Sequence, residues 1–202
     1  MLIDITLKIT PEIVKDAQGN EKKAQTGHLG THFDVMDKEF PLEYTRRAGI
    51  VFDVSDVAGR DINAGDVDLS QIKAGMFAAF CTGFIEKEGY GSRSYFHEHP
   101  QLSNELIDLL LEKGVSIIGI DCAGVRRGKE HTAKDQYCAD RGVFIVENLC
   151  NLRSVLDACG LCIVHTYPMN YAGMTGLPCR VIAEIQSTDK PEATEADHYG
   201  TV

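Results

Sequence analysis

Six short apolar runs, each rich in valine, isoleucine or phenylalanine, constrain the fold of this chain more than any other feature of its sequence. Each run has the length of a buried strand and is too short for a typical helix. The runs cover residues 49–55, 75–84, 115–121, 143–148, 161–167 and 178–185. A seventh strand is predicted in residues 1–9, where isoleucine and leucine alternate with polar residues. The chain is therefore predicted to build a substantial sheet.

Two helical patterns lie between these strands, over residues 103–114 and 132–142. Ser103 and Thr132 are expected to cap their N-termini, and a glycine ends each of them. A shorter third helix is expected over residues 154–160. Helix followed by buried strand thus occurs twice, which indicates a mixed α/β fold.

The length of 202 residues and the lack of an internal repeat or a Gly/Ser linker predict one domain over residues 1–186. Residues 187–202 are acidic and contain few apolar residues, so we expect a mobile C-terminal tail. The net charge of −10 argues against nucleic acid or an anionic membrane as a partner, because both would repel such a surface.

Three features of the sequence bear on the cellular location. The alternating start does not have the unbroken apolar run of a signal peptide, and no stretch approaches the roughly 20 apolar residues of a membrane span. Seven cysteines, an odd number, indicate reduced thiols. We therefore expect a soluble cytoplasmic protein.

The segment HLGTHFD, residues 28–34, carries the strongest chemical signal. In one extended strand His28 and His32 would lie about 13 Å apart, too far to share a ligand. A sharp bend at Gly30, followed by a new strand with His32 and Asp34 on one face, would bring all three side chains together.

The spacing alone leaves two interpretations open. Two imidazoles and a carboxylate are a typical ligand set for catalytic zinc and also for manganese or iron. The alternative is a polar loop whose histidines bond to backbone groups.

The same segment resembles the signature of the putative cyclase family, which includes bacterial kynurenine formamidases and isatin hydrolases. That pattern is His-x-Gly-Thr-His-x-Asp-x-Pro-x-His, and its first seven positions match residues 28–34. Further segments resemble the family in the same order: DITLKI, FCTGF, HPQLSNELIDLLLEKGVSIIGIDCAGV, ADRGVFIVENLCNL and GLPCRVIAEI. The resemblance implies a β/β/α fold with a mixed central sheet and flanking helices, assembled as a homodimer or higher homo-oligomer.

The resemblance also implies the site. His28, His32 and Asp34 correspond to metal ligands, and Glu147 to the late carboxylate of the site. Asp135 stands twelve residues before Glu147, where the family has a histidine. A carboxylate can replace an imidazole on such a metal, and His131, one helical turn earlier, is a possible substitute. Alternatively, Asp135 lies on an exposed helix surface.

Two further positions depart from the family pattern, because Met36 replaces its proline and Lys38 its final histidine. The histidine is placed to move protons, and a lysine would need a strongly lowered pKa to do so. Either the chemistry uses another base, or the site has changed its substrate or lost its activity.

The resemblance implies a metal-dependent hydrolase of an amide, cyclic amide or lactone, similar to arylformamidases and acting on a small molecule. Zinc or manganese is the expected divalent metal, which activates water and polarises the carbonyl group. Glu147, Asp135 and Lys38 are the candidates for proton transfer.

Two rival functions remain open. The first is a non-catalytic small-molecule-binding or scaffold member of the family with a degenerate metal site. The second is thiol redox chemistry at Cys159 and Cys162, which would require an accessible thiol of low pKa.

Overall fold

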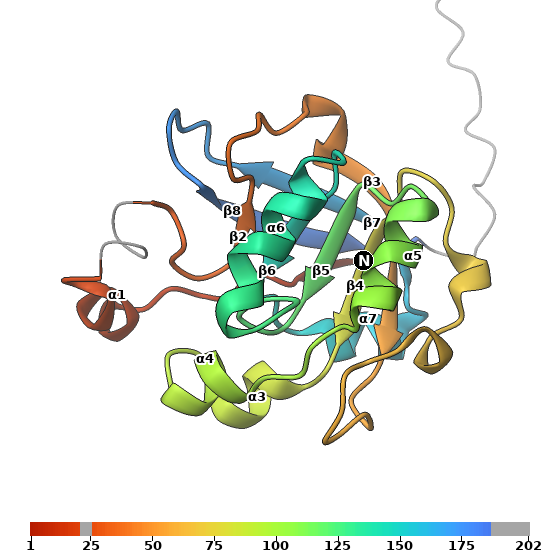
Figure 1. Cartoon of the computed structure of the whole chain (residues 1–202), viewed down its shortest axis with the longest axis horizontal. Coiled ribbons are helices and arrows are strands. Elements are labelled where there is room, and N and C mark those ends of the chain that lie inside the picture. Colours follow the sequence, from red (N-terminus) through yellow and green to blue (C-terminus); the bar gives the residue numbers. More distant parts are fainter. Residues whose placement is uncertain (21–25, 187–202) are drawn as a thin grey trace, which may run out of the picture.

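A single mixed sheet dominates the computed structural model, which describes residues 1–20 and 26–186 (Figure 1). Each of the six apolar runs coincides with one of its strands, so these predictions are confirmed, whereas the predicted N-terminal strand already ends at Asp4. The strands are β1 (Leu2–Asp4), β2 (His32–Asp34), β3 (Arg46–Asp53), β4 (Phe77–Cys81), β5 (Ile117–Ile120), β6 (Phe144–Glu147), β7 (Leu161–Pro168) and β8 (Gly176–Glu184).

The sheet closes on itself because β8 uses both of its edges. One edge pairs with β7, and the other pairs with β2 and, further along, with β1. The strand order β8-β2-β6-β5-β4-β3-β7 therefore returns to β8 and forms a seven-stranded, barrel-like ring. The pairings among β3, β4, β5 and β6 are parallel and the others antiparallel. The predicted mixed sheet with flanking helices is confirmed.

Alternate residues of these strands serve two cores, as expected from the period of two in a strand. The inner core fills the ring, where Phe33, Phe77 and Phe144 pack together with smaller residues. The outer core lies between the sheet and helices α5 (Asn104–Glu112) and α6 (His131–Ala139), which cover its outer face (Figure 1).

The start of α6 differs from the prediction. Ser103 does cap α5, since its Oγ accepts a hydrogen bond from the Leu106 N–H at 3.1 Å. Thr132, however, does not cap α6. A 3₁₀ turn over Gly128–Glu130 leads directly into the helix, so His131 is already its first residue.

The remaining helices are short. They are α1 (Pro11–Ala17), α3 (Phe84–Glu88), α4 (Arg93–Glu98) and α7 (Leu152–Ala158). Among residues 1–20 and 26–186, no helix is long and apolar enough to cross a membrane. The predicted tail, residues 187–202, lies outside the described part of the chain, and the single domain over residues 1–186 stays a prediction.

Candidate metal centre

The chain bends at Gly30, as the sequence predicts. Gly30 has a φ of 70°, and a Cβ atom built there would lie 2.4 Å from the Ile9 side chain. Both the backbone conformation and the close approach of Ile9 therefore favour glycine at this position. After the bend, β2 begins at His32, so His28 can fold back toward the strand.

The pairing of β2 with β6 then brings an imidazole and two carboxylates of the site together. His32 and Asp34 lie on one face of β2, and His32 is the direct partner of Glu147 on β6. Phe33, between them, points to the inner core. The site therefore lies on the outer face of the sheet, where β2 and β6 approach α6.

Helix α6 adds His131 and Asp135 to this group, which lie on the same side of the helix because they are four residues apart. Asp135 is only 3% exposed, so the alternative that it lies on an exposed helix surface is wrong. The structure thus brings together His28, His32, Asp34, Asp135 and Glu147, all singled out in the sequence, and places His131 beside them.

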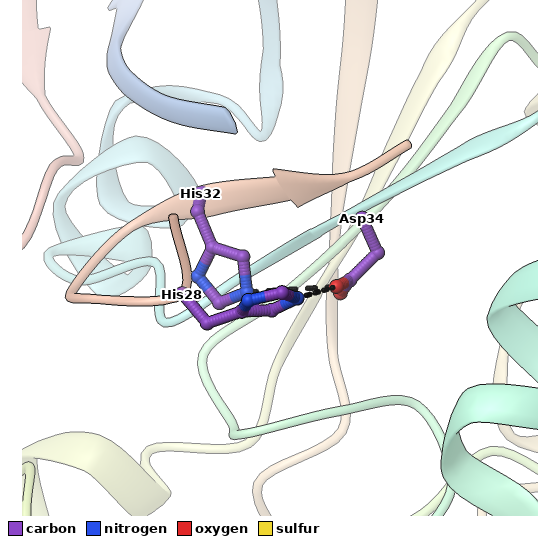
Figure 2. Close-up of side chains that lie close together, drawn as sticks. All are labelled: His28, His32 and Asp34. Carbon is purple, nitrogen blue, oxygen red and sulfur yellow. Dashed lines mark ion pairs between the residues drawn. The ribbon is translucent and has the colours of Figure 1, made fainter. Parts of the chain in front are cut away.

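Figure 2 shows the half of the group that is rich in nitrogen. The His28 and His32 rings meet at a centroid distance of 4.9 Å, and both Nε2 atoms face the same oxygen of Asp34. His28 Nε2 lies 3.2 Å and His32 Nε2 3.6 Å from Asp34 Oδ1. The two imidazoles and the carboxylate therefore converge on one point.

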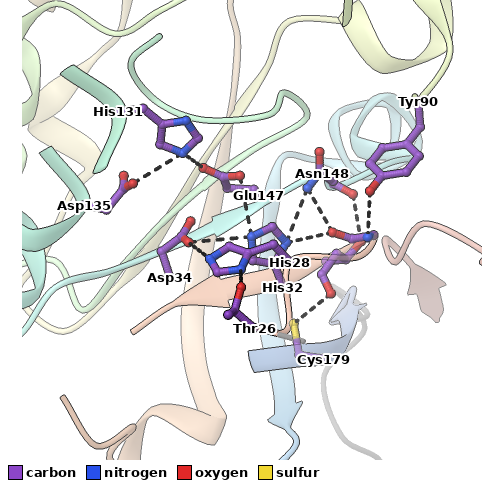
Figure 3. A network of polar contacts seen from close by, with 12 residues as sticks. Thr26, His28, His32, Asp34, Tyr90, His131, Asp135, Glu147, Asn148 and Cys179 are labelled. Carbon is purple, nitrogen blue, oxygen red and sulfur yellow. Dashed lines mark hydrogen bonds and ion pairs between the residues drawn. The ribbon is translucent and has the colours of Figure 1, made fainter. Parts of the chain in front are cut away.

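The other half is rich in oxygen (Figure 3). His131 Nε2 lies 2.9 Å from Glu147 Oε1 and 3.3 Å from Asp135 Oδ2. The second oxygen of Glu147 is 3.7 Å from His32 Nε2, so Glu147 connects the two halves. One donor atom each from Asp34, His131, Asp135 and Glu147 lie within 4.8 Å of one another.

The orientation of the His32 ring is set by the bend. Its Nδ1 lies 2.8 Å from the Gly30 carbonyl oxygen, which can only accept, so Nδ1 carries the proton in that bond. Nε2 is then the nitrogen that faces Asp34 and Glu147. Burial alone would lower the pKa of His32, but the two carboxylates outweigh it and raise this pKa to about 9. For Asp34, the neighbouring imidazoles overcome the effect of burial and hold the pKa below its usual range.

Two buried atoms indicate that the site suits a cation. His32 Nε2 and Asp34 Oδ2 have no hydrogen-bond partner among the described residues, and both side chains are at most 3% exposed. Buried polar atoms normally have partners. A divalent ion would satisfy both atoms, and imidazole with carboxylate is a donor set that zinc, manganese and iron accept. The residues therefore fit a divalent metal.

A cavity of about 700 Å³ opens over this group. Its lining includes all six donors and the apolar side chains of Met36, Phe96 and Ala123. Among the described residues that line it there is no lysine or arginine. A cavity with apolar walls and a few convergent polar groups is typical of a small-molecule site.

Comparison with known sequences identifies the family. The sequence model of the family described as Putative cyclase matches residues 3–127, more than half of the chain. The chain belongs to the putative cyclase family. No curated protein matches it.

Solved structures of cyclase-like proteins share the fold. A "potential metal-dependent hydrolase with cyclase activity" is 22% identical, with a TM-score of 0.70 over 91% of this chain and 96% of that one. Isatin hydrolase A from Ralstonia solanacearum is 16% identical, with a TM-score of 0.71 over 91% of both chains. Isatin hydrolase A from Labrenzia aggregata is 17% identical, with a TM-score of 0.69 over 91% of this chain and 93% of that one.

The two departures from the family pattern are linked in the structure. Met36 has a φ of 58°, a value that proline cannot adopt because its ring holds φ near −65°. The chain therefore leaves β2 along a path that a proline at residue 36 would not permit. Lys38, two residues on, lies in the wall of a neighbouring cavity, with its Nζ 2.7 Å from Asp140 and 3.0 Å from Asp37. The structure does not bring Lys38 to the metal-site group.

A buried network behind the site escaped the sequence reasoning. Asn148, directly after Glu147, donates from Nδ2 to the Gly30 carbonyl at 2.9 Å and accepts at Oδ1 from the Tyr95 hydroxyl at 2.8 Å. The Tyr90 hydroxyl accepts from the Gly30 N–H at 3.0 Å (Figure 3). Asn148 has a positive φ of 56°, a backbone conformation that asparagine adopts more readily than most residues. This conformation is not visible in a single sequence, so no sequence signal pointed to the network.

The geometry gives no support to thiol chemistry at Cys162. This thiol is buried, and burial raises its pKa to about 12, so the reactive thiolate is disfavoured at neutral pH. Cys159, by contrast, is exposed.

Proposed function

We propose that the chain is a metal-dependent hydrolase that cleaves an amide, a cyclic amide or a lactone. The observation that carries this proposal is the cavity whose lining includes three imidazoles and three carboxylates, where His32 Nε2 and Asp34 Oδ2 have no hydrogen-bond partner among the described residues. A divalent metal held there by His28, His32 and Asp34, with Asp135 and Glu147 close by, would lower the pKa of a water molecule and polarise the scissile carbonyl.

The side chains have separate tasks in this proposal. His32 is held by the Gly30 carbonyl with Nε2 toward the site, so it is ready to bind a cation without rearranging. Glu147 is placed for proton transfer, because Oε1 lies 2.9 Å from His131 Nε2 and Oε2 faces His32. His131 is 32% exposed, so a proton held by Glu147 has a route to solvent through this ring. Asp135 supports the same ring at 3.3 Å.

Lys38 stays a candidate for proton transfer that this geometry does not favour. Its ammonium group is bonded to Asp140 and Asp37, and these carboxylates raise its pKa above the ordinary value. A base at neutral pH needs the opposite shift.

The substrate class follows from the walls of the cavity. Phe96 and Met36 offer apolar contact beside the polar floor, which suits a flat ring attached to the bond that is cleaved. The isatin hydrolases that share the fold are consistent with such a substrate. We therefore propose an arylformamide or a ring-fused cyclic amide, with zinc or manganese as the metal.

A second candidate is a binder that retains the cavity without turnover. The position of Lys38, which stands at the motif's last histidine but lies outside the group, favours it. A cytoplasmic location and assembly as a homodimer or higher homo-oligomer are also proposals. Tyr167 and Met169, 60% and 49% exposed on β7 and just after it, suit a contact between copies, which light scattering would detect.

The deciding experiment is hydrolysis of a panel of arylformamides, cyclic imides and lactones by metal-free protein, with and without added Zn²⁺ or Mn²⁺. We expect turnover that depends on added metal and stops with chelator. Saturable binding of a panel member without turnover, in protein shown to contain metal, would instead support the binder.

A further inference from the structure

Met36 borders two cavities. It lines the metal-site cavity of about 700 Å³ and also a neighbouring cavity of about 500 Å³. The lining of the neighbouring cavity comes from residues 35–45 and 167–177, around the end of β7 and the start of β8. Among the described residues, Met36 is the only one that the two linings share. The two cavities therefore meet at this side chain.

The backbone on both sides of this border is held by hydrogen bonds. The Thr175 carbonyl accepts one from the Val35 N–H at 2.9 Å and one from the Met36 N–H at 3.1 Å. Thr175 lines the metal-site cavity, whereas Met174, the residue before it, lines the neighbouring cavity. The two segments that separate the cavities are thus bonded directly to each other.

At Met36 the cavities are separated by a flexible side chain. Methionine has three rotatable side-chain bonds and a polarizable sulfur, so it adapts to the shape of its surroundings. The Met36 side chain is partly buried and packs against the inner core. A change of its rotamer requires no movement of the hydrogen-bonded backbone around it, so this residue is suited to act as a movable border.

The chemistry of the neighbouring cavity suits a neutral, apolar group. Its lining includes the apolar side chains of Phe40, Met174 and Leu177. Lys38 also lies there, but its ammonium group is 2.7 Å from Asp140 and 3.0 Å from Asp37, so its charge is already balanced. An anionic group would therefore gain little in this cavity.

We infer that the substrate is an aromatic amide whose apolar substituent extends past Met36 into the neighbouring cavity. Met36 follows Asp34 by two residues, so their Cα atoms are at most about 7 Å apart, a distance that a phenyl ring with its amide can span. Met36 then determines how long a substituent the site accepts. The inference rests on the proposed function, because the amide has to lie over the metal-site group for its substituent to reach Met36.

The test uses formanilides with a para-alkyl chain of zero to eight carbons. Calorimetry on the metal-free, full-length protein measures their affinity without turnover, and the metal-loaded protein gives kcat/KM. Each methylene group that becomes buried in the neighbouring cavity should raise the affinity by about fourfold. We expect kcat/KM to rise with chain length in the same order.

The decisive variant is Met36→Ala, which removes the side chain at the border. An octyl chain then no longer has to displace Met36, so the preference for the octyl over the unsubstituted compound should rise by about tenfold. Met169→Ala is the matched control, because Met169 lines only the neighbouring cavity and is 49% exposed. This control should not raise the preference. Far-ultraviolet circular dichroism checks the fold of both variants, and the wild-type series tests the inference even if Met36→Ala does not fold.

Three outcomes would overturn the inference. The first is an affinity that does not depend on chain length in the wild-type protein. The second is a preference that Met36→Ala changes no more than Met169→Ala does, since the chain would then lie elsewhere. The third is a second copy of the chain that occupies the neighbouring cavity, which light scattering would show as a dimer that Met169→Ala weakens and that long chains do not enter.

The same experiment separates this inference from the proposed function. Hydrolysis of the whole series with equal kcat/KM leaves the hydrolase intact and removes the role of Met36. Binding that increases with chain length, without hydrolysis by the metal-loaded protein, removes the hydrolase and assigns both cavities to a binder.

Discussion

Charged side chains are arranged in opposite ways on two sides of the same sheet. At the end of β3, Asp53 pairs with Arg153 of α7, whose Nη2 lies 3.0 Å from Asp53 Oδ1. Both side chains are almost half exposed, at 45% and 49%. Between β2, β6 and α6, by contrast, three carboxylates are almost completely buried, and imidazoles are their only basic neighbours among the described lining residues.

The difference lies in how the charge of each group is balanced. Asp53 has its own cation and is also solvated, so its charge costs little. The carboxylates of the site have lost most of their hydration, and the neighbouring imidazoles, together with the cation proposed for the cavity, would replace it. The following predictions test this contrast, from the largest expected effect to the smallest.

His32→Ala should have the largest effect, because it removes the donor that is best oriented for a cation. We expect metal affinity to fall by more than about 100-fold, beyond the usual cost of losing a group that only supports a ligand, and turnover to be lost with it. Elemental analysis and activity assays measure the two effects. His165→Ala is the matched control, since this ring on β7 pairs with Glu184 of β8 and neither residue lines the cavity. A fully active, metal-free His32→Ala protein would exclude the proposed centre.

Removal of the metal should destabilise the folded protein. A ligand that binds only the folded state at 100 times its Kd stabilises it by about 2.7 kcal/mol, so chelation should lower the melting temperature and metal should restore it. Thermal unfolding with and without chelator measures the change. His32→Ala should show almost no response to either treatment. An equal response of this variant would mean that the metal binds elsewhere.

Tyr95→Phe should lower both the stability of the protein and its metal affinity, although Tyr95 is not itself a metal ligand. The Tyr95 hydroxyl satisfies Asn148 Oδ1, and without it this buried acceptor loses its partner, at a cost of about 1–3 kcal/mol in unfolding free energy. Metal affinity should fall too, because Asn148 also holds the Gly30 carbonyl that orients His32. Tyr137→Phe removes a half-buried hydroxyl bonded to Asp108 and should cost less. Equal losses in the two variants, measured by urea unfolding, would argue against a special role for the network.

The sequence predicted those parts of the site that depend on local geometry. Glycine tolerance of a positive φ predicts the bend at Gly30, and the period of two places His32 and Asp34 on one face. The apolar runs predict the strands because a short continuous run rich in valine, isoleucine and phenylalanine suits a buried strand. Thr132 was the wrong N-cap, because a 3₁₀ turn over Gly128–Glu130 leads directly into α6 and puts Glu130 at the N-cap position, two residues earlier.

What the sequence could not reveal depends on contacts between distant segments. The ring closes because β8 pairs with both β2 and β7, and no local pattern encodes a strand's two neighbours. Likewise Tyr95 meets Asn148 only because α4, one of the short helices absent from the prediction, lies beside the segment that follows β6. The burial of Asp135 also required the structure, since its helix is mostly polar in sequence.

The smallest effect is expected at the exposed Asp53–Arg153 pair. Arg153→Ala should cost at most about 1 kcal/mol of stability at pH 7 and leave metal binding unchanged. The Arg153 hydrogen bond lowers the pKa of Asp53 to about 2, below its unfolded value of about 3.9. The contribution of the pair is therefore complete above about pH 4 and is lost as the pH falls toward 2. Urea unfolding at several pH values should show the wild-type advantage shrinking over this range, whereas an advantage that persists at pH 2 would show that Arg153 stabilises the fold through packing rather than charge.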